Sequence, residues 1–131
     1  MKKIVVNGTF DILHPGHLAL LNKARSMGDH LLVCIDTDRR VSELKGAARP
    51  VNNNFERRNL LMNIKAVDEV KFFDQDFELE MILKEYEPDV MVKGSDYKDK
   101  PIVGSQYCKH IEYVDLNEYS TTRKIQDIIN R

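Results

Sequence analysis

The sequence has no tryptophan and only two cysteines among its 131 residues. Cys34 and Cys108 lie far apart, and no C-x-x-C pair suggests a zinc or redox site, so we expect two free thiols. No apolar run is long enough to cross a bilayer, and Asn7 and Gly8 end the first run too early for a secretory signal. The formal net charge of −1 leaves no basic excess to attract a nucleic acid. These absences predict a cytoplasmic protein that binds small molecules rather than membranes or nucleic acids.

Short apolar runs alternate with longer amphipathic segments along the chain. Apolar residues make up 42% of the sequence, enough to form the core of a single domain that comprises residues 1–131. Strands are predicted at residues 4–6, 31–35, 70–73, 89–92 and 111–114, and helices at residues 15–27, 55–66, 77–86 and 120–129. Residues 36–54 are expected to form a polar loop. This alternation predicts an α/β fold with a five-stranded, mostly parallel sheet and right-handed crossovers.

Each predicted helix carries an apolar stripe that we expect to face the sheet. In chain order, the stripes consist of Leu18, Leu21, Ala24 and Met27, then Leu60, Leu61 and Ile64, then Leu79, Ile82 and Leu83, and finally Ile125, Ile128 and Ile129. In open parallel sheets, ligands bind beyond the carboxyl ends of the strands, where the strand order reverses. Functional residues are therefore expected directly after the strands.

The segment from Asn7 to His17 joins the first strand to the first helix and holds the densest group of unusual residues. Gly8 allows a tight turn, and Gly16 allows a ligand to approach the start of the helix without a side chain in the way. The amino end of a helix attracts anions through its unpaired N–H groups and its dipole. His14 and His17 are three residues apart, so both rings can face a phosphate there and stabilise developing charge.

This segment also has more ordinary interpretations. Two histidines can belong to a zinc site or lie on the surface, but zinc needs further ligands, and no third histidine or cysteine is nearby in the sequence. Asp11 is interpreted either as part of a turn or cap, or as a weak candidate to hold Mg²⁺ beside a bound triphosphate. The absence of a G-x-x-x-x-G-K-[ST] run disfavours a P-loop ATPase.

The run G-T-F-D-x-x-H-x-G-H, from Gly8 to His17, resembles the signature of the cytidylyltransferase-like nucleotidyltransferases. Further motifs follow in that family's order: L-K-G at 44–46, R-P-V-N at 49–52, E-R-R at 56–58, V-K-G-S-D-Y-K at 92–98, G-S at 104–105 and S-T-T at 120–122. The resemblance covers essentially the whole chain. It implies a Rossmann-like, doubly wound sheet with helices on both faces, and an enzyme that commonly forms a homodimer.

The resemblance also implies roles for the residues of each motif. His14 and His17 are expected to act on the triphosphate, and Lys45 to close over it from a glycine-containing loop. Arg58 is expected to reach a phosphate. The residues expected to bind the nucleotide are Gly8, Thr9, Phe10, Gly16, Arg58, Asp96, Tyr97, Ser120, Thr121 and Thr122.

Each of these later motifs has a structural alternative. Lys45 can be a solvated surface lysine, and Arg58 can form a helix-surface ion pair, with Arg57 as its more ordinary neighbour. Asp96 and Tyr97, which the resemblance places near the base and ribose, can form a polar turn. Residues 120–122 can simply cap the last helix, although capping hydroxyls and free N–H groups also form a phosphate cradle.

Two branches of the family are compatible with the sequence. The runs V-K-G-S-D-Y-K, I-V-G-S and Y-S-T-T most resemble the adenylyltransferase that activates heptose 1-phosphate. The alternative is glycerol-3-phosphate cytidylyltransferase, which uses CTP and typically carries an arginine in an R-T-E-G-I-S-T-T run. Residues 115–122, the corresponding stretch, contain no arginine. The kinase domain that is fused to some heptose enzymes is not recognised, so we expect a separate protein to supply the earlier step.

The expected reaction transfers AMP from ATP to a sugar phosphate such as D-glycero-D-manno-heptose 1-phosphate and releases pyrophosphate, with Mg²⁺ accompanying the triphosphate. A phosphate monoester is already anionic near neutral pH because its second pKa is about 6, so no general base is needed. A regulatory module that binds nucleotide without catalysis, and a purely structural scaffold, are the alternatives. The complete set of motifs argues against the first, and the crowded loop before the first helix argues against the second.

Overall fold

The computed structural model describes residues 1–115, and the predicted last helix lies outside this range. Within it, five strands form one sheet in the order β3-β2-β1-β4-β5, and every neighbouring pair is parallel. The strands are β1 (Lys3–Gly8), β2 (His30–Asp36), β3 (Glu69–Phe73), β4 (Val90–Gly94) and β5 (His110–Val114). All five predicted strands are confirmed, because short apolar runs bounded by polar residues are a strong strand signal.

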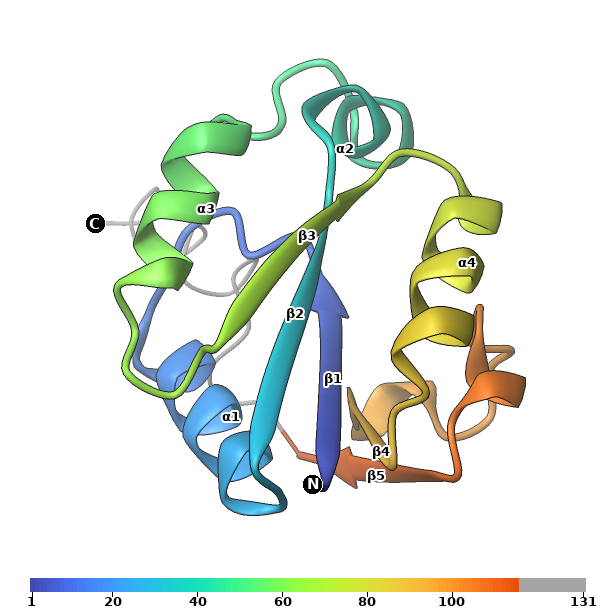
Figure 1. The fold of residues 1–131 in the computed structure, drawn as a ribbon. Coiled ribbons are helices and arrows are strands. Elements are labelled where there is room, and N and C mark those ends of the chain that lie inside the picture. Colours follow the sequence, from blue (N-terminus) through green and yellow to red (C-terminus); the bar gives the residue numbers. More distant parts are fainter. Residues whose placement is uncertain (116–131) are drawn as a thin grey trace.

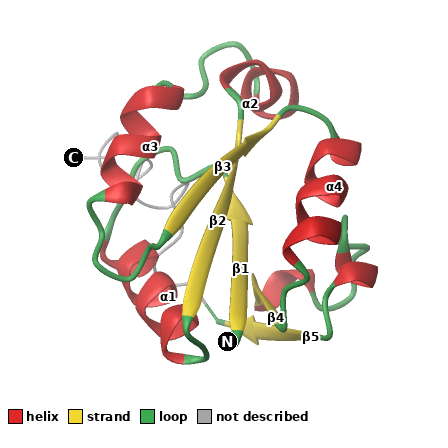
Figure 2. Ribbon diagram, viewed as in Figure 1, coloured by secondary structure: helices red, strands yellow, loops and turns green. Residues whose placement is uncertain are grey.

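The helices lie on both faces of this sheet. They are α1 (Pro15–Ser26), α2 (Asp38–Lys45), α3 (Asn54–Met62) and α4 (Asp76–Tyr86), followed by two short turns of 3₁₀ helix, η1 (Ser95–Tyr97) and η2 (Ser105–Tyr107). Figure 1 shows α1 and α3 on one side of the sheet and α4 on the other, and the same layers are visible in Figure 2. This arrangement confirms the predicted doubly wound, Rossmann-like α/β fold. No helix within residues 1–115 is both long enough and apolar enough to cross a membrane.

Alternating side chains along each strand divide the core into two layers. On β1, Val6 packs with Leu21 of α1 and Leu61 of α3, whereas Val5 faces the opposite layer with Leu83 of α4. Each fully buried side chain of this kind contributes about 1.5–3 kcal/mol relative to an exposed one. The two layers therefore hold the strands in register, and that register aligns their carboxyl ends.

Both cysteines are free thiols, as predicted. Cys34 is buried in β2, and burial raises its pKa to about 12. Cys108 is partly buried, and burial raises its pKa to about 11. Thiols with such pKa values stay protonated near neutral pH and are poor nucleophiles.

The prediction of a polar loop over residues 36–54 was wrong, because α2 forms within it. Thr37 caps this helix by accepting a hydrogen bond from the Arg40 N–H group, and Arg39 forms an ion pair with Glu43 one turn later. Only Val41 of α2 is buried. A helix that buries a single side chain has no apolar stripe, so the periodicity of the sequence did not predict it.

Two expectations about buried faces were also wrong. Leu18 is exposed on α1, where Leu20 is buried instead, and Leu60 is exposed on α3. The helix predicted over residues 55–66 corresponds to α3, which ends at Met62. In α3 the buried residues are Arg57 and Leu61, so a charged side chain occupies a position that periodicity would assign to an apolar one.

Candidate active site

The carboxyl ends of the strands meet around one pocket. Parallel register pairs Gly8 with Ile35 and Asp36 with Phe73, which brings the ends of β1, β2 and β3 to the same edge of the sheet. A pocket of about 310 Å³ opens there, and the strand order reverses at this edge between β1 and β4. Its lining residues are Asn7, Gly8, Thr9, Asp36, Arg40, Leu44, Lys45, Phe73, Lys93, Tyr97, Pro101, Ile102 and Val103. This is the position at which open α/β sheets bind ligands.

The loop between β1 and α1 has an unusual backbone. Phe10 adopts a left-handed conformation with φ of 49°, although its side chain is buried. A Cβ atom on Gly8 would lie only 3.1 Å from the Phe10 ring. The absence of a side chain at Gly8 therefore makes room for that ring. Left-handed non-glycine residues of this kind concentrate at functional sites.

The paired histidines cap the first turn of α1. His14 Nδ1 accepts a hydrogen bond from the Gly16 N–H group at 3.1 Å, and His17 Nδ1 accepts one from the His14 N–H group at 3.3 Å. The two ring centroids are 4.1 Å apart. Because each Nδ1 accepts, each neutral ring carries its proton on Nε2. The sequence prediction that both rings lie together at the start of this helix is confirmed, and Pro15 occupies the first helical turn as expected.

His17 is electrically neutral near pH 7. Burial lowers the pKa of His17 most, and the neighbouring His14 and Lys45 lower it further. A hydrogen bond with the backbone of Ile12 raises it, and the net result is a pKa of about 4. A neutral imidazole donates a hydrogen bond but carries no full positive charge. Positive charge near the expected triphosphate position is therefore supplied by cations such as Lys45 rather than by His17.

Asp11 has a structural role in this protein. Its carboxylate accepts hydrogen bonds from Arg49 Nε at 2.9 Å and from the N–H groups of Val51 at 2.9 Å and Asn52 at 2.8 Å. The segment R-P-V-N is thereby tied to the loop between β1 and α1. Both carboxylate oxygens already have donors, which favours the turn-and-cap interpretation over Mg²⁺ binding. Among residues 1–115, no group of three or more His, Cys, Asp or Glu side chains could hold a metal ion.

Replacing Asp11 with asparagine is expected to lower the free energy of unfolding by about 1–3 kcal/mol at pH 7, because the amide has only one acceptor oxygen and its NH2 group cannot accept from the remaining donors. Burial alone would raise the pKa of Asp11, but the hydrogen bonds from Asn52, Val51 and Arg49 outweigh it and lower the pKa. A lowered folded-state pKa means that the stabilisation is present above the unfolded value of about 3.9 and is lost as pH falls through the folded value.

The measurement is urea unfolding at pH 7 and at pH 3, with the exposed Asp99→Asn as the matched control. The difference in free energy of unfolding between wild type and Asp11→Asn should be smaller at pH 3 than at pH 7. The control should have the same free energy of unfolding as wild type at both pH values. An equal gap at both pH values would contradict a role for the ionised carboxylate.

The two neighbouring arginines of α3 lie in different surroundings. Arg58, predicted to reach a phosphate, is exposed, and that role stays a prediction. Arg57, interpreted as the ordinary neighbour, is completely buried. Its guanidinium donates to the backbone oxygens of Thr9, Asp36 and Asn52 at 2.8–3.0 Å, and to the side chains of Asp38 and Asn54 at 2.8 and 3.0 Å. Arg57 therefore fixes the ends of β1 and β2 around the pocket.

Lys45 and Tyr97 line the same pocket, but they come from different elements, and their predicted roles toward the nucleotide stay predictions. Lys45 is the last residue of α2 rather than part of a loop, and Tyr97 belongs to η1 after β4. Burial lowers the pKa of the Lys45 ammonium, and nearby Arg49 lowers it further. Asp96 is exposed beside Tyr97. Ser120, Thr121 and Thr122 lie outside the described residues.

Sequence reasoning missed three charged residues of the pocket: Arg40 on α2, and Asp36 and Lys93 at the ends of strands. Asp36 ends β2 and Lys93 lies near the end of β4, and both are buried. Their position directly after apolar strand residues is the signal that could have identified them. A carboxylate and an ammonium at strand ends are otherwise ordinary surface groups, so without the pocket nothing distinguishes them.

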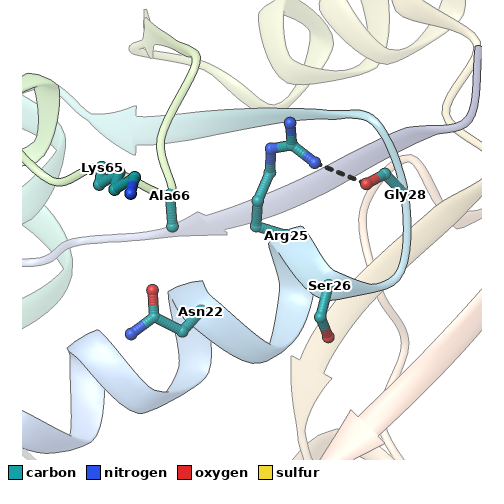
Figure 3. A pocket seen from close by; sticks show the side chains of 6 residues that line it. All are labelled: Asn22, Arg25, Ser26, Gly28, Lys65 and Ala66. Carbon is teal, nitrogen blue, oxygen red and sulfur yellow. Dashed lines mark hydrogen bonds between the residues drawn. The ribbon is translucent and has the colours of Figure 1, made fainter.

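A larger cavity of about 480 Å³ lies near the amino ends of β2 and β3 (Figure 3). Its lining residues are Asn22, Arg25, Ser26, Gly28, Lys65 and Ala66. The guanidinium of Arg25 already donates to the Gly28 carbonyl at 2.6 Å and pairs with Asp68 at 3.0 Å. The Arg25 guanidinium of this cavity is thus already paired within the protein. The cavity also lies far from the carboxyl ends of the strands, where the histidines lie.

The doubly wound sheet thus carries paired imidazoles at the start of its first helix and cations around its carboxyl edge. The chain belongs to the cytidylyltransferase-like family, whose model matches residues 5–127. It is 47% identical over 125 residues to the bifunctional protein HldE of Campylobacter jejuni strain RM1221, and 45% identical over 130 residues to that of Helicobacter hepaticus. These matches cover 95% and 99% of this chain and 27% of each relative, so the chain spans about a quarter of their length.

A solved structure supports the fold. The lipopolysaccharide core biosynthesis protein from Thermoplasma volcanium GSS1 superposes with a TM-score of 0.71 at 24% sequence identity. The match covers 88% of this chain and 98% of that protein. At this level of identity the similarity concerns the arrangement of the sheet and helices.

Proposed function

We propose that this protein transfers AMP from ATP to a sugar phosphate, such as D-glycero-D-manno-heptose 1-phosphate, and releases pyrophosphate. The observation that carries the proposal is the pair of capping imidazoles beside a cationic pocket at the carboxyl edge of the sheet. Similarity to bifunctional HldE proteins over almost the whole chain supports the heptose branch that the motifs favour. A soluble, cytoplasmic homodimer is part of the proposal, and sedimentation velocity would test its oligomeric state.

In the proposed reaction, an oxygen of the acceptor phosphate attacks the α-phosphorus of ATP. A new P–O bond forms while the bond from the α-phosphorus to the bridging oxygen breaks, and the electron pair leaves with pyrophosphate. The nucleophile is already ionised, so the protein must align the groups and stabilise the charge on the leaving group. His14, His17 and Lys45 are proposed to serve this purpose. Mg²⁺, held mostly by phosphates and water, would neutralise part of the triphosphate charge.

Pyrophosphate release tests this proposal directly. ATP and CTP are each combined with heptose 1-phosphate and with glycerol 3-phosphate, with Mg²⁺ present. We expect turnover with ATP and heptose 1-phosphate, and much less with the other three pairs. Turnover with CTP and glycerol 3-phosphate instead would assign the protein to the cytidylyltransferase branch. Nucleotide binding without pyrophosphate release from any pair would indicate a regulatory module.

A further inference from the structure

Polar contacts, rather than apolar packing, fix the position of α2. Val41 is the single buried residue of this helix, so apolar packing alone leaves its rotation about its own axis poorly defined. The helix nevertheless supplies Arg40, Leu44 and Lys45 to the pocket at the carboxyl edge of the sheet. Lys45 is the last residue of the helix, so the place that its side chain takes depends on how the amino end of α2 is attached.

Asp74, the residue directly after β3, collects the contacts of that amino end. Its carboxylate accepts hydrogen bonds from Arg39 Nε, 2.8 Å from Oδ1 and 3.0 Å from Oδ2, and from the Thr37 hydroxyl at 2.5 Å. Its backbone oxygen accepts from Arg39 at 3.3 Å and from Arg40 at 3.4 Å. The hydrogen bonds from Arg39 and Thr37 lower the pKa of Asp74, so the carboxylate is ionised at neutral pH.

Thr37 connects Asp74 to the first turn of the helix. Its hydroxyl donates to Asp74 and also caps α2 by accepting from the Arg40 N–H group at 3.3 Å. The Thr37 N–H group donates to the Phe73 carbonyl at 3.1 Å, next to the last paired residues of β2 and β3. Asp76, the first residue of α4, accepts from the Arg40 guanidinium at 2.7 Å. The start of α2 is thus attached to the turn between β3 and α4.

α2 is also held from the opposite side. Asp38 pairs with the buried Arg57 of α3 at 2.8 Å, and the Ser42 hydroxyl donates to the Arg49 carbonyl at 2.6 Å. The helix therefore bridges two parts of the molecule, and both attachments together set which of its faces points into the pocket. Without the attachment at Asp74, the helix can turn on the remaining contacts and carry Lys45 with it.

We propose that Asp74 is a positioning residue, which acts through Arg39 and Thr37 to orient α2 and so holds Lys45 at the pocket. The role toward Lys45 rests on the proposed function, in which its ammonium stabilises charge on the leaving pyrophosphate. Neither Asp74 nor Arg39 lines the pocket. A displacement of about 1 Å caused by a remote substitution can cost roughly 10²-fold in rate, so a contact outside the pocket can control turnover.

Hydrogen exchange and steady-state kinetics of Asp74→Asn test this role. The backbone amides of α2 should exchange faster than in wild type, whereas those of β1 and β2 should be unchanged, because the lost contacts are local. With ATP and heptose 1-phosphate, kcat is expected to fall roughly tenfold to 10²-fold. Since Lys45 is proposed to act on charge that develops in the transition state, kcat/KM should fall by the same factor.

Two further variants complete this comparison. Arg39→Gln removes the same contact from the helix side and should reproduce both effects. Glu85→Gln is the matched control, because it removes one negative charge from an exposed position near the other end of α4 and should change neither exchange nor kcat. Circular dichroism verifies that each variant is folded.

A double-mutant cycle shows whether Asp74 acts through Lys45. In the Lys45→Ala background, Asp74→Asn should lower kcat by less than about twofold, because the side chain that it positions is already missing. An equal loss in both backgrounds would overturn the proposal, because a general structural effect would persist without the lysine.

The remaining outcomes separate this proposal from the proposed function. Unchanged exchange in α2, faster exchange throughout the sheet, or wild-type kcat in a folded Asp74→Asn would each overturn the positioning role alone. A wild-type protein that releases pyrophosphate from no substrate pair would overturn the proposed function. The hydrogen-exchange comparison would still decide whether Asp74 anchors α2, since it requires no turnover.

Discussion

Replacing His17 with alanine is expected to lower kcat by roughly 10²–10³-fold, the typical cost of one charge-stabilising donor. The physical reason is positional. His17 lies at the amino end of α1, where helix N–H groups and the helix dipole favour a phosphate, and its ring is held against His14 with centroids 4.1 Å apart. The fold should persist, because the buried core of α1 consists of Leu20, Leu21 and Ala24 rather than of the histidine.

The experiment is pyrophosphate release by His17→Ala at saturating ATP and sugar phosphate, with thermal unfolding as the check on folding. His110→Ala is the control, because His110 is an exposed histidine on β5 that pairs with Glu112 at 2.9 Å. Near-normal turnover by a folded His17→Ala variant would show that His17 does not stabilise the transition state. Since His17 has a pKa of about 4 in the free protein, kcat/KM should show no ionisation of this residue between pH 6 and pH 8.

Replacing Arg57 with methionine is expected to destabilise the protein by about 3–5 kcal/mol, the usual cost of removing one member of a buried charged network. Methionine fills much of the same space but supplies no donor, so the backbone oxygens of Thr9, Asp36 and Asn52 would be left without their partner. The carboxylate of Asp38 would lose its ion pair at 2.8 Å as well. Because these groups belong to three separate segments, the damage would extend to the pocket.

Urea unfolding monitored by circular dichroism measures this effect. Arg58→Met is the matched control on the next residue of α3, and it should change the free energy of unfolding by no more than about 0.5 kcal/mol because Arg58 is exposed. Equal stabilities of the two variants would show that the hydrogen bonds of Arg57 contribute little beyond its packing. Retained stability of Arg58→Met together with a higher KM for ATP would support the predicted phosphate role of Arg58.

The contrast between these two arginines shows where the sequence was insufficient. Both follow Glu56 in one motif, and nothing in the local pattern distinguishes them. The family motif directed attention to Arg58, whereas the turn of α3 directs Arg57 inward beside Leu61. Which of two adjacent helical residues faces the core depends on how the helix packs, and here the packing buried a charged residue whose partners come from distant segments.

Asp11 illustrates the same limit. The sequence offered two interpretations of this residue, and a choice between them required the position of residues 49–52. Those residues are brought to Asp11 by tertiary structure, with Arg49 Nε 2.9 Å from its carboxylate. Asp36 and Lys93 were overlooked for a related reason, since they become a site only where β2 and β4 end at one pocket.

The order of the strands along the chain, the helices α1, α3 and α4, the parallel sheet and the position of the paired histidines could be predicted from the sequence, whereas α2 could not. Each depends on local signals, namely apolar periodicity and the glycines and proline that punctuate the first loop. Tertiary structure alone decided which charged side chains became buried and which carboxylates acquired donors. Those outcomes depend on contacts between residues far apart in the chain, and the free energy of burying a charge is set by the groups that surround it after folding.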